Sequence, residues 1–186
     1  SSYPGEMREL WDRSRPYLHI RNYGYGYPQG VTNLSHEMDD ARIRGQEVWF
    51  YNNKAIQSTD RSCARMFFGM WGWKVGADGL TTWTYPGGRT IQFELVREGI
   101  DDSRYLNMLE RLIDEKAGNL SDREDAQRFL DMFRRSITLD KNGYITNWSS
   151  TMQSAAEKCL PDVDGQDPFL LFKHRIGDFI RKLSSE

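Results

Sequence analysis

The chain has 186 residues, of which 38% are hydrophobic, 28% charged and 13% aromatic, and its formal net charge is −2. This charge balance gives no electrostatic reason to expect nucleic acid or an anionic membrane as a partner, and no apolar run approaches the roughly 18 residues that a membrane-spanning helix needs. The aromatic content is too high for a disordered chain. We therefore predict one folded domain, or one and a half, that needs no disulfide or metal ion for stability.

The first 116 residues alternate between helical and strand patterns. In chain order they predict a helix over 6–14, a strand over 17–23 followed by an aromatic loop at 24–30, a helix over 35–44, a strand over 47–51, a helix over 60–75, a strand over 80–85 and a helix over 90–116. Such alternation is typical of parallel strands joined by right-handed crossovers. We therefore predict an α/β fold in which parallel strands alternate with helices.

Two of these segments are expected to be buried. Residues 47–51 (EVWFY) form a nearly continuous apolar run, which is typical of a parallel strand covered on both faces. Residues 60–75 are apolar on most sides of the predicted helix. We expect Trp49, Trp71 and Trp73 to pack in the core.

The pattern changes after residue 116. Residues 121–136 predict a charged surface helix, a further helix is expected near 151–159, and 169–183 form a strongly amphipathic closing helix after a polar linker. We therefore divide the chain into a partial barrel domain over 1–116, a helical insertion over 117–168 and a closing segment over 169–186.

The cysteines and histidines predict neither a disulfide nor a metal site. Cys63 and Cys159 are far apart and lie outside any CxxC or Cys/His cluster, so we expect two separate buried or half-buried thiols. The three histidines are scattered along the sequence. We predict no metal ion and no other cofactor.

The carboxyl ends of parallel strands are where ligands bind in α/β folds. This rule selects aromatic, amide and guanidinium side chains as substrate-binding candidates: Arg21, Asn22, Tyr23, Tyr25, Tyr51, Asn52, Asn53, Trp83 and Tyr85. The C–H face of a sugar stacks on an aromatic ring while amides and guanidinium groups hydrogen-bond its hydroxyls. The set therefore predicts a carbohydrate subsite, with core packing as the alternative role of Trp83 and Tyr85.

The carboxylates do not predict a catalytic pair. A glycosidase needs two carboxyl groups, or one together with a substrate acetamide, facing the sugar. Glu98, Asp101 and Asp102 lie in the predicted long helix, where charges are usually solvated or paired with neighbours. We assign Arg97 and Asp101 to an ion pair near the start of this helix, and we leave the catalytic residues unassigned.

Residues 71–106 carry a resemblance to a known family. The segment WGWKVGADG at 71–79, the strand end and turn WTYPG at 83–87, and the run REGIDD at 97–102 resemble the last two units of a glycoside-hydrolase-like (β/α)8 barrel. This is the group numbered 4091 among the domains of unknown function, which is related to glycoside hydrolase family 123. GQEVWFY at 45–51 is similar to the preceding strand of that family.

The resemblance implies that the chain supplies the last three βα units of a TIM-type barrel, followed by a C-terminal helical extension. A complete barrel has eight strands in about 250 residues. The first half is then expected from the N-terminal half of the same barrel or from a partner chain. We expect the open edge of the first strand to be covered by the helices of 121–160 or by such a partner. No residue here matches the Asp-Glu pair of similar enzymes.

The resemblance implies a sugar-handling part of a protein that hydrolyses glycosidic bonds, with N-acetylhexosamine-containing glycans as expected substrates. For a glycan hydrolase, a secreted or periplasmic location is expected. One alternative is a non-catalytic carbohydrate-binding or assembly module that is completed by another chain. Another alternative is an α/β domain with an aromatic-rich core and no ligand.

Overall fold

The computed structural model describes residues 13–25, 34–58, 60–82, 90–161 and 163–185. Three strands alternate with helices along the first half of the chain, and four longer helices follow. The described elements, in chain order, are η1 (Arg15–Tyr17), β1 (Ile20–Gly24), α2 (Leu34–Ile43), β2 (Glu47–Tyr51), α3 (Asn53–Gln57), α4 (Arg61–Met66), η2 (Phe67–Trp71), α5 (Gly72–Val75), β3 (Gly79–Thr81), α6 (Ile91–Asp114), α7 (Leu120–Ser136), α8 (Trp148–Cys159) and α9 (Pro168–Leu183).

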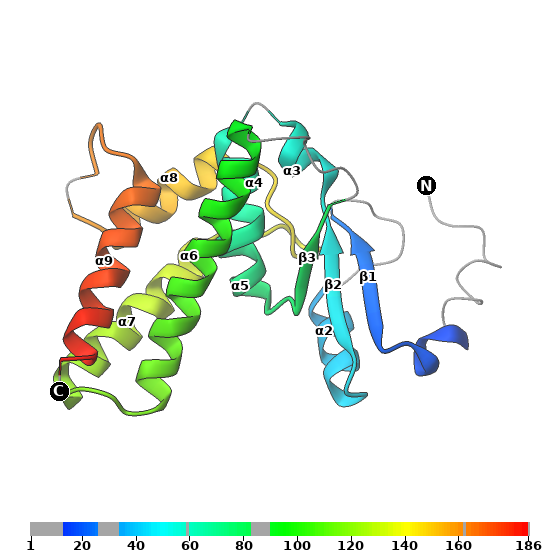
Figure 1. Ribbon diagram of the computed structural model, residues 1–186, viewed down its shortest axis with the longest axis horizontal. Coiled ribbons are helices and arrows are strands. Elements are labelled where there is room, and N and C mark those ends of the chain that lie inside the picture. The colour runs from blue at the N-terminus through cyan, green and yellow to red at the C-terminus, as the bar shows by residue number, and fades with distance from the viewer. Residues whose placement is uncertain (1–12, 26–33, 59, 83–89, 162, 186) are drawn as a thin grey trace.

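The three strands form one parallel sheet in the order β1-β2-β3 (Figure 1). The register places Asn22 of β1 beside Trp49 of β2, and Trp49 beside Gly79 of β3. The predicted α/β class and the alternation of parallel strands with helices are confirmed. The barrel itself stays a prediction.

The sheet has one buried face and one face that is more exposed. On the buried face Tyr23 donates a hydrogen bond to Glu37 of α2, and the ring of Phe50 packs on that of Trp71 in η2. The helices that follow β1 and β2 therefore cover the same face. The prediction that residues 47–51 are covered on both faces is wrong, because side chains alternate along a strand and those of Glu47, Trp49 and Tyr51 point to the other side.

Residues 61–75 form one continuous helical segment, in which η2 is a π-helical stretch between α4 and α5. The buried helix predicted over 60–75 is confirmed, as is the burial of Trp71 and Trp73. This segment crosses α6 closely, because a Cβ at Gly69 would lie 2.8 Å from the carbonyl oxygen of Gly99. Only glycine allows the two backbones this approach.

The C-terminal helices form a second layer beside the sheet (Figure 1). α7 is not only a charged surface helix, since Phe129 and Phe133 lie on its buried side and contact Phe172 of α9. One buried hydrophobic cluster continues from Tyr23 to Leu183, across all three predicted segments. α7 and most of α8 lie away from the outer edge of β1 and do not cover it (Figure 1), although Trp148 at the start of α8 contacts Tyr25, which follows β1.

Several predicted boundaries change. The strand predicted over 80–85 is described as β3 over Gly79–Thr81, while residues 83–89 lie outside the described part of the chain. The helix predicted over 6–14 also lies largely outside it. α3 was not predicted from the sequence; it follows β2 directly because the Asn52 side chain accepts a hydrogen bond from the Ala55 N–H and caps it.

Candidate functional site

Arg21 lies inside the fold rather than at a ligand-binding surface. Its side chain has no exposed area and donates from Nε to Gln46 Oε1 at 2.8 Å, from Nη2 to Asp40 Oδ2 at 2.7 Å and from Nη1 to Glu37 Oε2 at 3.4 Å. A buried guanidinium needs such partners because its desolvation is costly. The hydrogen bond from Arg21 lowers the pKa of the Asp40 carboxyl. Arg21 therefore presents no donor at the surface to a sugar hydroxyl.

Tyr23 belongs to the same buried group. Its hydroxyl donates to Glu37 Oε2 at 2.6 Å, and Glu37 also pairs with Arg15. Burial raises the pKa of the Tyr23 phenol, and the hydrogen bond to Glu37 raises it further. α2 and β1 are thus joined by a polar cluster beneath the sheet, and the Tyr23 hydroxyl faces this cluster rather than a ligand-binding surface.

Tyr25 and Asn52, at the carboxyl ends of β1 and β2, have structural partners as well. The Tyr25 hydroxyl donates to the carbonyl oxygen of Ile145 at 3.1 Å and accepts from its N–H at 2.7 Å. The Tyr25 ring lies between those of Trp71, Tyr144 and Trp148. Asn52 is buried and caps α3. These contacts fix loop ends, so little of either side chain faces outward.

The other candidates lie at or beyond the strand ends. Asn53 is half-buried and its Oδ1 accepts a hydrogen bond from Thr82 Oγ1 at 3.4 Å. Asn22 is exposed and Tyr51 is half-buried, both on the less buried side of the sheet. Trp83 and Tyr85 lie outside the described residues. For Asn22, Tyr51 and Asn53, carbohydrate binding stays a prediction.

We call the less buried side of the sheet the open face. Its side chains, which are exposed or half-buried, come from all three strands and are Ile20, Asn22, Glu47, Trp49, Tyr51 and Thr81. The indole N–H of Trp49 donates to Glu47 Oε2 at 2.8 Å. The same indole lies over Gly79, where an added Cβ would overlap the ring. Gly24 stands beside Tyr51 in the register. Two aromatic rings therefore share one face with amide, hydroxyl and carboxylate groups.

Trp49 is the residue that sequence reasoning assigned to the core instead of to this face. The signal was present in the period of two: Glu47, Trp49 and Tyr51 alternate with Val48 and Phe50. A charged residue at one position of the alternation marks its face as the one in contact with solvent. Because the residues that follow Glu47 are all apolar or aromatic, the segment looks uniformly hydrophobic and the alternation is easily missed.

The carboxylates of α6 have structural partners. Asp102 is buried and accepts from Arg65 Nε at 2.5 Å and from Nη2 at 2.9 Å. Burial raises the pKa of Asp102, and the Arg65 guanidinium offsets this only in part. Partial burial favours the neutral form of Glu98, yet Lys173 and Arg65 together lower its pKa. The predicted pair of Arg97 and Asp101 is confirmed at 3.1 Å.

Three further features of the described residues concern metal ligands, thiols and membrane-spanning helices. Within those ranges, no three His, Cys, Asp or Glu side chains gather in a way that would hold a metal ion. Cys63 and Cys159 are both free and buried, as predicted from their spacing, and burial raises the pKa of the Cys63 thiol to about 12. None of the described helices has the length and apolar character that crossing a membrane requires.

Comparisons with protein-family models, with curated proteins and with solved structures gave no match for this chain.

Proposed function

We propose that the chain forms the carbohydrate-binding part of a glycoside-hydrolase-like protein and that its open face is the sugar-binding surface. The observation that carries this proposal is that Trp49 and Tyr51, both half-buried, share the open face of the sheet. Alternate residues of a strand are about 7 Å apart. The two rings therefore form a short aromatic platform, which suits an oligosaccharide better than an isolated ring does.

The neighbours of the two aromatic rings support a hydroxyl-rich ligand. Gly79 lies beneath the Trp49 indole and Gly24 lies beside Tyr51, so no larger side chain from these positions competes for the ring faces. Asn22, next to Trp49 in the register, is exposed and offers both a donor and an acceptor. A sugar placed on the rings would find hydrogen-bonding groups at their edges.

Hydrolysis is proposed for the parent protein rather than for this chain alone. The open face carries one carboxylate, that of Glu47, among the described residues, and it already accepts the Trp49 N–H. A hydrolytic site needs a second acid or a substrate acetamide placed against the sugar ring. In this proposal the catalytic pair comes from the other half of a barrel, and this chain supplies the platform.

The second candidate function is a non-catalytic binding or assembly module that another chain completes. It is favoured by the sheet itself, because β1 and β3 each have a single neighbour within the described part of the chain. Parallel sheets are usually continued or covered at such edges. Analytical ultracentrifugation tests this alternative: a stable dimer would favour assembly, and a monomer that binds sugar would favour the platform.

The platform is tested by isothermal titration calorimetry with chitotetraose and cellotetraose. We expect saturable binding by the wild type and a loss of about tenfold or more in affinity for Trp49→Ala, because the stacking surface is removed. Tyr51→Ala should lose less or the same. Tyr105→Ala on α6 is the matched control, since Tyr105 is a partly exposed aromatic residue of the helical layer.

Two outcomes would contradict the proposal. One is the absence of saturable heat for both oligosaccharides with folded wild-type protein. The other is an equal loss of affinity in Tyr105→Ala and Trp49→Ala. Release of reducing ends from chitotetraose by this chain alone would show instead that the acid pair is contained within it.

A further inference from the structure

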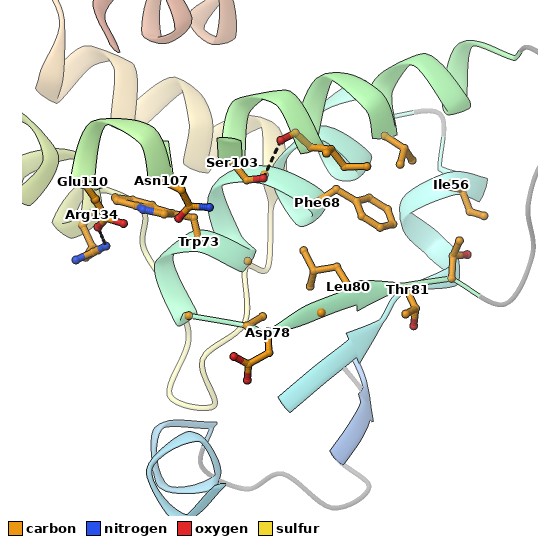
Figure 2. A pocket seen from close by; sticks show the side chains of 18 of the residues that line it. Ile56, Phe68, Trp73, Asp78, Leu80, Thr81, Ser103, Asn107, Glu110 and Arg134 are labelled. Atoms are coloured by element: carbon orange, nitrogen blue, oxygen red, sulfur yellow. Dashed lines mark hydrogen bonds and ion pairs between the residues drawn. The ribbon is translucent and has the colours of Figure 1, made fainter. Parts of the chain in front are cut away.

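A pocket of about 740 Å³ lies between β3, the helical segment of residues 61–75 and α6 (Figure 2). It borders the open face at Gly79 and Thr81, but its interior lies on the opposite side of β3, where Leu80 points into it (Figure 2). Consecutive residues from Ala77 to Thr82 line one wall of this pocket. Its volume is within the range of pockets that hold small organic ligands.

The two ends of the pocket differ in chemistry. Figure 2 shows Phe68, Leu80 and Ile56 toward one end, where the lining is apolar. At the other end the indole of Trp73 lies beside Asn107, close to the pair formed by Glu110 and Arg134. The pocket therefore fits a molecule with a larger apolar part and one polar group.

The polar end holds two buried N–H groups that find no acceptor among the described residues. One is Nε1 of Trp73, whose residue is only 7% exposed, and the other is Nε of Arg134. The two groups are adjacent, since the Arg134 guanidinium carbon lies 4.2 Å from the centre of the Trp73 ring. Buried donors are almost always paired in proteins because an unpaired one destabilises the fold. A ligand with an acceptor oxygen would complete the pairing of Trp73 once a small side-chain shift opens a path to the enclosed Nε1.

The charges of the lining indicate that this acceptor is uncharged. Arg134 is already paired with Glu110, while the Asp78 carboxylate accepts a hydrogen bond from the Val48 N–H and points away from Leu80 (Figure 2). Among the described residues, the lining therefore offers no unpaired positive charge to a carboxylate or phosphate group. A carbonyl oxygen accepts a hydrogen bond from an indole N–H without needing such a charge.

We propose that this pocket binds an uncharged, largely apolar small molecule, and that a carbonyl oxygen of the molecule accepts a hydrogen bond from Trp73 Nε1. The apolar part lies against Phe68 and Leu80. This site is separate from the sugar-binding surface and does not depend on it.

The test uses 6-propionyl-2-dimethylaminonaphthalene, an uncharged fluorescent ketone, as the probe. We expect saturable one-to-one binding by the wild type. Trp73→Phe keeps an aromatic ring but removes the N–H, so it should weaken binding by about tenfold and shift the emission of the bound probe to shorter wavelength. No hydrogen bond of the free protein is removed by this change, because Trp73 Nε1 has no described partner.

A second pair of variants keeps the proposal testable if Trp73→Phe fails to fold. Ile100 lines the pocket and is 36% exposed, so Ile100→Glu places a charge in it without disturbing a fully buried site. Leu170→Glu is the matched control, because Leu170 is 49% exposed on α9 and is not among the pocket residues. Ile100→Glu should reduce probe affinity at least tenfold and Leu170→Glu should leave it unchanged.

Three results would overturn the proposal: no saturable probe binding by the folded wild type, equal losses in Ile100→Glu and Leu170→Glu, or an unchanged emission wavelength in a folded Trp73→Phe variant. Probe binding should also persist in Trp49→Ala. Its loss there, or displacement of the probe by chitotetraose, would mean that the probe occupies the open face instead. The two proposals can therefore fail independently, and these experiments show which of them has failed.

Discussion

The two faces of the sheet show how one strand can serve two different purposes. Arg21 and Asn22 are consecutive in β1, yet Arg21 is enclosed by three hydrogen-bonding partners while Asn22 is exposed to solvent. The buried face uses its polar groups to join β1 to α2. The open face presents polar and aromatic groups outward. Whether a polar residue of β1 can contact a ligand therefore depends on which face of the sheet its side chain occupies, and this alternates from one residue to the next.

The largest expected effect comes from breaking the buried cluster. Arg21→Met should lower the free energy of unfolding by about 3 kcal/mol, because it leaves Glu37 and Asp40 without their buried counter-charge. Urea unfolding followed by circular dichroism measures this change. Asn22→Ala, one residue along and on the open face, should change stability by no more than about 0.5 kcal/mol. Similar losses in the two variants would show that the faces do not differ as described.

A smaller effect is expected at Gly79, where the Trp49 indole of the open face lies on the backbone of β3. Gly79→Ala should cost about 1–3 kcal/mol, because the new methyl group would overlap the Trp49 indole. In a Trp49→Ala background the same change should be nearly neutral. A double-mutant cycle by urea unfolding measures this coupling. An equal cost in both backgrounds would place the strain elsewhere in β3.

The smallest expected effect is a dependence on pH. Because Arg21 lowers the pKa of Asp40 in the folded protein, the ionised carboxylate stabilises the fold above about pH 4 and loses this contribution as the pH falls below it. Asp40→Asn should therefore reduce the loss of stability between pH 5 and pH 3. Unfolding curves at the two pH values measure this loss. Asp39→Asn, which changes the neighbouring exposed carboxylate, should leave the wild-type slope, and an equal reduction in both variants would contradict the assignment.

The sequence was sufficient for the features that depend on local pattern. The parallel strands, the buried helix around Trp71 and the closing amphipathic helix follow from periodicity and from breaks between segments. It was also sufficient for the free thiols of Cys63 and Cys159, because their spacing excludes the common clusters. These features require no knowledge of what lies opposite each residue.

The candidate site could be predicted only in part, because burial depends on partners that are distant in the chain. Asp102 looks like a surface charge until Arg65, 37 residues earlier, is placed beside it. Arg21 looks like a ligand-binding residue until Gln46 and two carboxylates enclose it. Phe129 and Phe133 differ from these residues, because their i, i+4 spacing is a local signal of a buried side of α7 that the prediction of a charged surface helix overlooked.

The contact between Tyr25 and Ile145 has a consequence for synthesis on the ribosome. The two residues are 120 positions apart, and the rings of Trp71, Tyr144 and Trp148 complete the cluster around Tyr25. The end of β1 cannot reach its final packing until residues beyond 148 have left the ribosome exit tunnel. Until then the nascent segment that ends in Tyr25 exposes aromatic side chains. A chaperone that binds aromatic segments would have its main opportunity in that interval.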